Sequence, residues 1–154
     1  MASELRELYQ EVILDHTRNP RNFRAQPEAK LRAEGFNPLC GDKATIYVQM
    51  DGDVIRDVSF EGKGCSISTA SASMMTEALE GKTREEAERL FERFHALITS
   101  SPGAVEESIA PELGKLKVFA GVCEFPVRVK CASLPWHTFR SALEGKTDAP
   151  VSTE

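Results

Sequence analysis

Three of the four cysteines have neighbours that favour a thiolate able to bind a metal or a sulfur atom. Cys40 stands in an Asn-Pro-Leu-Cys-Gly-Asp sequence, where Gly41 lets the backbone turn so that the thiol and the carboxylate of Asp42 can reach one point. A soft sulfur ligand and a hard oxygen ligand can then share a zinc or an iron ion. Alone, this triplet is a weak signal, because a capping aspartate beside a buried cysteine has the same sequence.

Cys65 gives a stronger signal. It ends a Gly-Lys-Gly-Cys sequence and directly precedes a predicted helix. The partial positive charge of a helix N-terminus lowers the pKa of a thiol. Gly62 and Gly64 leave space beside the sulfur for something bulky. Phosphate binding is not indicated, because the sequence has neither the Walker lysine pattern nor the dinucleotide spacing.

Cys131 follows two cationic residues, Arg128 and Lys130, and nearby cations stabilise a thiolate. Cys123 differs, because its neighbours are apolar or anionic and raise the pKa of a thiol, so we expect it to be structural. The gaps between the cysteines match no zinc-finger spacing. Any shared site must therefore be assembled by the fold from distant segments.

The three histidines add little to this set. His137 is a candidate ligand, although a single surface histidine is more often only solvated. His16 and His95 lie in or beside helical patterns and are expected to have no special role. A Cys–His hydrolase is therefore a weak alternative.

Hydrophobic periodicity predicts the elements that must bring these residues together. The first is a helix at 3–17. Antiparallel strands follow at 43–50 and 53–60, joined at Asp51-Gly52 and with a bulge near Val54-Ile55. The remaining elements are a helix ending at Gly81, a helix opened by a Thr83/Glu86 capping box, a short helix near 109–118, and a last helix from about Arg128 or Ala132 to Leu143. Residues 21–39 show no period and are expected to form a loop. The small polar residues after Cys65 fit either a solvated turn or a helix packed closely on another backbone.

The expected fold class is α+β, a small antiparallel sheet of two or three strands with helices packed on one side. We expect one domain at 1–145 and a flexible C-terminal tail at 146–154, because the last residues are polar and aperiodic. A net charge of −5 argues against general nucleic-acid binding. No signal peptide is recognisable, and no apolar run approaches the roughly 18 residues of a membrane span, so we expect a cytoplasmic protein with reduced cysteines.

Four motifs, in this order, resemble the U-type iron–sulfur cluster assembly proteins, the group of IscU, SufU and the N-terminal domain of NifU. They are Leu8-Tyr9 with Ile13-Leu14-Asp15-His16 and Asn19-Pro20-Arg21-Asn22, then Asn37-Pro38-x-Cys40-Gly41-Asp42, then Gly62-x-Gly64-Cys65-x-Ile67-Ser68-x-Ala70-Ser71, then Arg128-x-x-Cys131-x-x-Leu134-x-Trp136. The likeness extends from about Leu5 to Leu143. It implies a fold of the SufE/NifU type.

Within this group the chain is more similar to the SufU branch. The segment between Cys65 and Cys131 is long, and Lys130 occupies the position where the IscU branch has a histidine. Pro135 departs from the small residue that usually follows the leucine, and it bears on where the last helix begins.

The resemblance implies a metal or cluster site made of Cys40, Asp42, Cys65 and Cys131. It also implies zinc or a transient iron–sulfur cluster as cofactor, Cys40 as persulfide acceptor, and Cys131 as the alternative acceptor. The implied partners are a cysteine desulfurase and downstream acceptors of sulfur or clusters, with neither nucleic acid nor membrane involved. Three alternatives stay open: a non-enzymatic assembly scaffold, a zinc-dependent sulfurtransferase that builds no cluster, and a zinc-stabilised adaptor without sulfur chemistry.

Overall fold

The computed structural model describes residues 2–38, 41–99, 113–145 and 151–152. In chain order the elements are α1 (Ala2–Arg18), β1 (Leu31–Asn37), β2 (Asp42–Asp51), β3 (Val54–Lys63), α2 (Ser66–Leu79), α3 (Arg84–Thr99), the 3₁₀ helix η1 (Gly114–Glu124), α5 (Pro126–Leu143) and β4 (Val151–Ser152). None of the described helices is long and apolar enough to span a bilayer.

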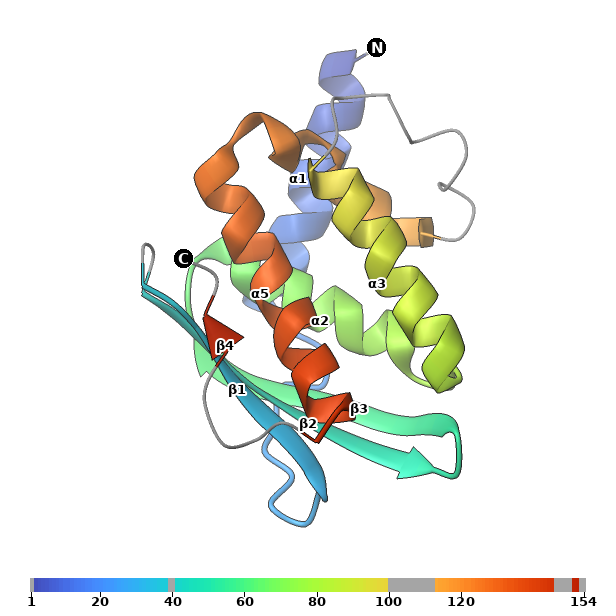
Figure 1. Cartoon of the computed structure of the whole chain (residues 1–154). Coiled ribbons are helices and arrows are strands. Elements are labelled where there is room, and N and C mark those ends of the chain that lie inside the picture. Colours follow the sequence, from blue (N-terminus) through green and yellow to red (C-terminus); the bar gives the residue numbers. More distant parts are fainter. Residues whose placement is uncertain (1, 39–40, 100–112, 146–150, 153–154) are drawn as a thin grey trace.

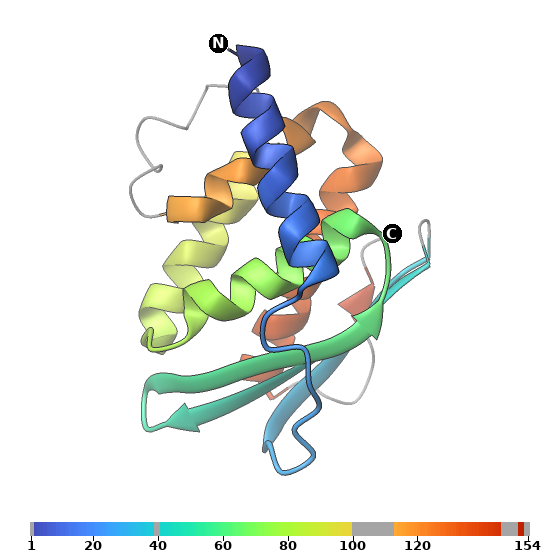
Figure 2. The same ribbon diagram turned by 180° about the vertical axis from the view of Figure 1, so that it is seen from behind.

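The strands form one sheet in the order β3-β2-β1-β4, and the helices are stacked on one of its faces (Figures 1 and 2). β1, β2 and β3 pair antiparallel, whereas the short β4 runs parallel to β1. The predicted α+β class with a small antiparallel sheet is confirmed. β4 places Val151 and Ser152, from the expected tail, beside Gly35 and Phe36, while the rest of 146–154 lies outside the described residues.

The predicted hairpin is present and runs slightly longer than expected. Asp51 pairs with Val54, and Gly52 adopts a φ of 63°, which glycine tolerates without strain. The register shifts between Gln49 and Met50, so the bulge lies on β3 next to the expected position.

The expectation of a loop at 21–39 is wrong for its second half, which forms β1. Its inward residues are Ala33, Gly35 and Asn37, so the strand shows no alternation of large apolar side chains. A Cβ built on Gly35 would lie 2.0 Å from Oγ1 of Thr138, because α5 packs directly on this strand. The small residues that hid the strand are the ones that allow this contact.

The capping box predicted for α3 is confirmed, since Glu86 N donates to Thr83 Oγ1 at 3.1 Å and Thr83 N donates to Glu86 Oε1 at 3.0 Å. Two other boundaries differ. η1 begins at Gly114, within the range 109–118 expected for the short helix, and ends at Glu124, beyond that range, while 109–112 lie outside the described residues. α5 begins earlier than expected, at Pro126, where a proline suits the first helical turn. Pro135 lies inside this helix rather than at its start.

α2 occupies the middle of the helical layer, and its small residues are explained by close packing rather than by solvation. Ser71 is fully buried, and its hydroxyl donates to the carbonyl of Ala132 on α5 at 2.5 Å. Trp136 of α5 donates its indole N–H to the same hydroxyl at 3.2 Å and stacks on Phe94 with ring centroids 4.6 Å apart. These contacts fix α5 against α2, the two elements that carry Cys131 and Cys65.

Candidate metal centre

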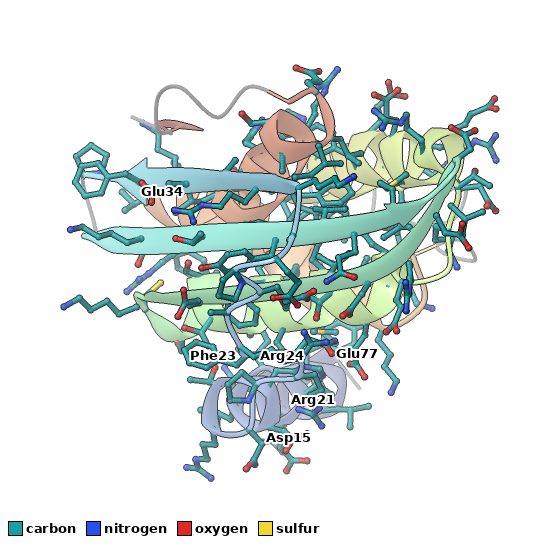
Figure 3. The ribbon with its side chains drawn as sticks, turned by 90° about the horizontal axis from the view of Figure 1, so that it is seen from below. Asp15, Arg21, Phe23, Arg24, Glu34 and Glu77 are labelled. Atoms are coloured by element: carbon teal, nitrogen blue, oxygen red, sulfur yellow. The ribbon has the colours of Figure 1, made fainter. Side chains whose placement is uncertain are left out.

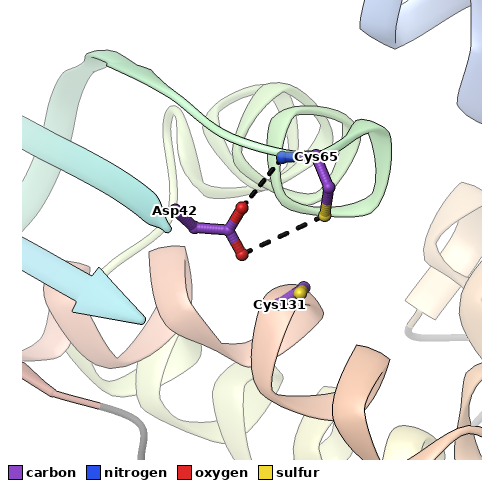
Figure 4. A group of neighbouring side chains, drawn as sticks. All are labelled: Asp42, Cys65 and Cys131. Carbon is purple, nitrogen blue, oxygen red and sulfur yellow. Dashed lines mark hydrogen bonds between the residues drawn. The ribbon is translucent and has the colours of Figure 1, made fainter. Parts of the chain in front are cut away.

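Asp42, Cys65 and Cys131 lie together at one end of the sheet (Figure 4). They come from the first residue of β2, the residue before α2 and the second turn of α5. One carboxylate oxygen and the two sulfurs all lie within 4.8 Å of one another. Asp42 and Cys131 are fully buried and Cys65 is partly exposed, so the group opens to solvent on the Cys65 side.

The carboxylate of Asp42 is held against the segment Gly64-Cys65. Its Oδ1 accepts the backbone N–H of Cys65 at 2.8 Å, and its Oδ2 lies 4.0 Å from the Cys65 sulfur. A Cβ on Gly64 would lie 2.5 Å from Oδ1, so only glycine fits beside the carboxylate. The Gly-Lys-Gly-Cys sequence therefore has a glycine at position 64 because the side chain of Asp42 lies directly against the backbone there.

Cys65 is the N-cap residue of α2, and its sulfur accepts the backbone N–H of Ser68 at 3.5 Å. The pKa of this thiol falls to about 6, chiefly because of its hydrogen bond with Cys131. Burial and the nearby carboxylate of Asp42 oppose this fall in pKa, while backbone N–H groups at the start of α2 reinforce it. Near neutral pH the Cys65 sulfur is therefore a thiolate, the form that binds metals and attacks sulfur.

Asn37 is a residue of the centre that sequence reasoning did not single out. Its side chain is fully buried at the end of β1. Its Nδ2 lies 3.4 Å from Oδ2 of Asp42 and 3.6 Å from the sulfur of Cys131, so it can donate to both. The only sequence signal was its place in the Asn-Pro-x-Cys motif, which gives no reason for an amide. Such outer contacts orient metal ligands and are part of a working site.

Cys40 and the side chain of Cys123 lie outside what the structure describes. Cys40 stands two residues before Asp42 in the sequence. The backbone of Cys123 belongs to η1. The ligand and acceptor roles of the four predicted residues stay predictions.

The candidate ligand His137 does not join this group. Its ring contacts Phe91 and His95, with centroids 5.2 Å and 5.9 Å away, and burial lowers its pKa. His16, expected to be unremarkable, is buried, and its Nδ1 lies 2.7 Å from the hydroxyl of Ser73. It thus joins α1 to α2, a role that only the tertiary structure could reveal.

Two sulfurs and one oxygen within this distance suit a tetrahedral ion, since zinc–sulfur bonds of about 2.3 Å place neighbouring ligands a little under 4 Å apart. The observed separations need only a small contraction to reach that geometry. A fourth ligand, from a nearby thiol or from a substrate, would complete the set. The arrangement can therefore hold zinc or iron and present a thiolate to a sulfur donor.

Comparison with known proteins agrees with this chemistry. Residues 8–132 match the family described as the NifU-like N terminal domain, and the chain belongs to that family. It is 37% identical over 152 residues to a protein of Streptococcus pyogenes serotype M1 named iron–sulfur cluster assembly scaffold protein IscU, covering 99% of this chain and 92% of the relative. It is 41% identical over 141 residues to the zinc-dependent sulfurtransferase SufU of Bacillus subtilis, covering 92% of both chains. The resemblance inferred from the four motifs is confirmed.

A solved structure shows the same fold. FiSufU of Fervidobacterium islandicum AW-1, assigned to the SUF system, superposes with a TM-score of 0.78 at 37% identity, covering 86% of this chain and 94% of the other.

Proposed function

We propose that the chain works in iron–sulfur cluster assembly, where it accepts persulfide sulfur from a cysteine desulfurase at a site that binds zinc, iron or a nascent cluster. The observation that carries this proposal is the convergence of Asp42, Cys65 and Cys131 from three separate elements to within 4.8 Å. Relatives named as an assembly scaffold and as a zinc-dependent sulfurtransferase support it.

The proposed ligands are Cys40, Asp42, Cys65 and Cys131, three sulfurs and one oxygen. Zinc accepts this set in a tetrahedron and would tie together segments that are distant in the sequence. Iron–sulfur clusters are usually held by four thiolates. A carboxylate in place of one thiolate holds iron less firmly, which suits a cluster that must pass to a downstream acceptor protein.

The sulfur-transfer step needs no external oxidant or reductant. The thiolate of Cys40 attacks the terminal sulfur of the persulfide on the donor's cysteine. A new S–S bond forms on Cys40, the old S–S bond breaks, and the donor cysteine leaves as a thiolate. Cys131 is the alternative acceptor. Cys65, with its pKa lowered to about 6, stays a thiolate at neutral pH and holds the metal side of the centre.

Two versions of this function differ in what leaves the protein. A non-enzymatic scaffold releases an assembled cluster, whereas a sulfurtransferase releases only sulfur and keeps zinc. Lys130 stands beside Cys131 where the IscU branch has a histidine, so Asp42 supplies the one ligand of the proposed set that is not a thiolate. This favours weak retention of a cluster in either version.

Metal analysis followed by a desulfurase assay tests the proposal. We expect about one zinc per chain, faster cysteine turnover by the desulfurase when the chain is added, and loss of sulfur labelling in Cys40→Ser. Brown colour after anaerobic reconstitution with iron and sulfide selects the scaffold version. Tight zinc without a stable cluster selects the sulfurtransferase. Tight zinc with neither faster turnover nor labelling would leave only the zinc-stabilised adaptor and refute the proposed function.

A further inference from the structure

Two lysines face each other across the strands that lead into the metal centre. Lys43 of β2 and Lys63 of β3 are direct antiparallel partners, and both are exposed. Like charges at directly opposite positions of a sheet are destabilising. Among the ion pairs of the described residues, neither lysine has an acidic partner that would offset this repulsion.

The pair lies at the rim of the centre rather than at a random place on the sheet. Lys43 directly follows Asp42, and Lys63 stands two residues before Cys65. The whole chain carries 24 acidic against 19 basic residues, for a net charge of −5. The two lysines therefore place positive charge next to the candidate ligands in a protein whose net charge is negative. This charge would attract an acidic surface that approaches the ligands.

Exposed apolar side chains stand beside Lys43 on the sheet and at the start of the helix that carries Cys131. Phe36 of β1 is the cross-strand partner of Lys43 and is 37% exposed. Phe125 and Val127, at the start of the helix that carries Cys131, are 60% and 51% exposed. Exposed aromatic and aliphatic groups beside charged ones are typical of a surface that docks another protein.

An edge strand often carries a lysine to discourage unwanted strand pairing, and β3 lies at the edge of the sheet. That explanation covers Lys63. It does not cover Lys43, which lies on the inner strand β2 and increases the repulsion. The open face of the sheet, turned away from the helices, offers other outward positions for a lysine, as Glu34 on β1 illustrates (Figure 3).

We propose that Lys43 and Lys63 dock an acidic patch on the sulfur-donor protein, next to its reactive cysteine. This inference rests on the proposed function and names the chemistry of the donor's surface. A carboxylate placed between the two ammonium groups relieves their repulsion, so the pair gains more from binding than two isolated lysines would. Because both lysines are exposed, the effect is mainly on the rate of encounter and depends on salt.

The test compares charge reversal at the rim with the same change elsewhere. Lys43→Glu/Lys63→Glu is the test variant, and Lys82→Glu/Lys115→Glu is the control with an identical change in net charge. Both control lysines are exposed, and Lys82 lies at the opposite end of β3, where its carbonyl accepts the N–H of Ile55. The readout is the chain concentration that gives half-maximal acceleration of a cysteine desulfurase, at low and high salt.

For the test variant we expect this concentration to rise about tenfold at low salt, with the plateau unchanged and most of the salt dependence lost. The control should stay within about twofold of wild type. Zinc content and sulfur uptake from inorganic polysulfide, which needs no docking, should match wild type in both variants. If wild type accelerates the desulfurase and the test variant does so equally well, the docking proposal is wrong and the proposed function stands. If wild type gives no acceleration, both are wrong.

The single variant Lys43→Glu separates docking from stability. It places a carboxylate opposite Lys63, so the thermal midpoint should rise while acceleration of the desulfurase weakens. A purely structural role would move both readouts in the same direction. Loss of self-association or of binding to a labelled DNA duplex in the double variant, with desulfurase acceleration intact, would assign the lysines to another partner and overturn the proposal.

Discussion

Gly64 keeps the carboxylate of Asp42 in place because it has only a hydrogen where other residues have a Cβ. We expect Gly64→Ala to push Asp42 away from Cys65, since the added atom would lie 2.5 Å from Oδ1. Zinc affinity should fall about tenfold or more, and the free energy of unfolding should fall by about 1–3 kcal/mol. Competition with a zinc chelator and urea unfolding measure the two effects.

The matched control is Gly121→Ala. A Cβ at Gly121 meets no atom within 4 Å, so alanine should leave zinc affinity unchanged there. Equal losses in the two variants would mean that the effect comes from the loss of glycine as such and not from contact with Asp42.

Asn37 provides a second test of how the ligands are oriented. Asn37→Ala removes the amide near both Asp42 and Cys131 but leaves every candidate ligand present. We expect zinc affinity to fall about 10-fold to 100-fold, as for other groups that orient ligands. Asn19→Ala, at an exposed asparagine whose amide donates to Asp15, should not change zinc affinity. Unchanged affinity in Asn37→Ala would show that the carboxylate and thiol are held without the amide.

The sequence identified candidate ligands of the centre, but it did not identify the side chains that contact and orient them. Cys65 and Cys131 were singled out because their neighbours favour a thiolate, whereas Asp42 joined the set through the family resemblance. Asn37 and His16 were missed, because an amide or a single histidine gains its role only when another element packs against it.

Among the elements, the contact of β1 with α5 decides where Cys131 lies relative to the sheet. Gly35→Ala should destabilise the fold by about 1–3 kcal/mol, because its Cβ would meet Thr138 Oγ1 at 2.0 Å. The double variant Gly35→Ala/Thr138→Ala should recover part of this loss, as urea unfolding of all four members of the cycle would show. Strictly additive losses would contradict the proposed clash.

Long amphipathic elements were predictable, and elements built on small residues were not. α1 and the β2–β3 hairpin show clear periods of 3.6 and 2. β1 turns Ala33, Gly35 and Asn37 inward, so its sequence lacks the alternation of large apolar side chains that predicts a strand. The start of α5 at Pro126 was missed because Pro135 suggested a boundary that packing against α2 overrides.

For the molecule as a whole, the buried His16, which joins α1 to α2, makes the free energy of unfolding depend on pH. Burial lowers its pKa below the usual 6.5, so the folded protein keeps it neutral while the unfolded chain takes up a proton. The stability it contributes is complete above about pH 6.5 and is lost as the pH falls below that value. His16→Gln, which has no such proton to gain, should flatten the fall in unfolding free energy between pH 7.5 and 5.5, as parallel urea titrations would show. An identical slope in both proteins would exclude His16 as the source.

The overall class of fold followed from the order of a hairpin and several amphipathic helices. The assembly of one centre from three distant segments did not follow from spacing, and only the family resemblance suggested it. Tertiary packing supplies the missing information, because contacts with Asn37 of β1 and Ser71 of α2 hold α5 beside Asp42.

Both outer strands of the antiparallel part of the sheet, β1 and β3, form backbone hydrogen bonds with short segments of the same chain. β4 pairs with Gly35 and Phe36 of β1, while the backbone of Asn22 and Arg24 and that of Lys82 bond to β3. Growth of a fibril by addition of strands needs a long edge strand with unpaired backbone groups. Among the described residues, these segments shorten the unpaired stretches of both outer strands. The pairing of Val151 and Ser152 with β1 therefore shields part of this edge from self-templated aggregation, and removal of β4 would expose it.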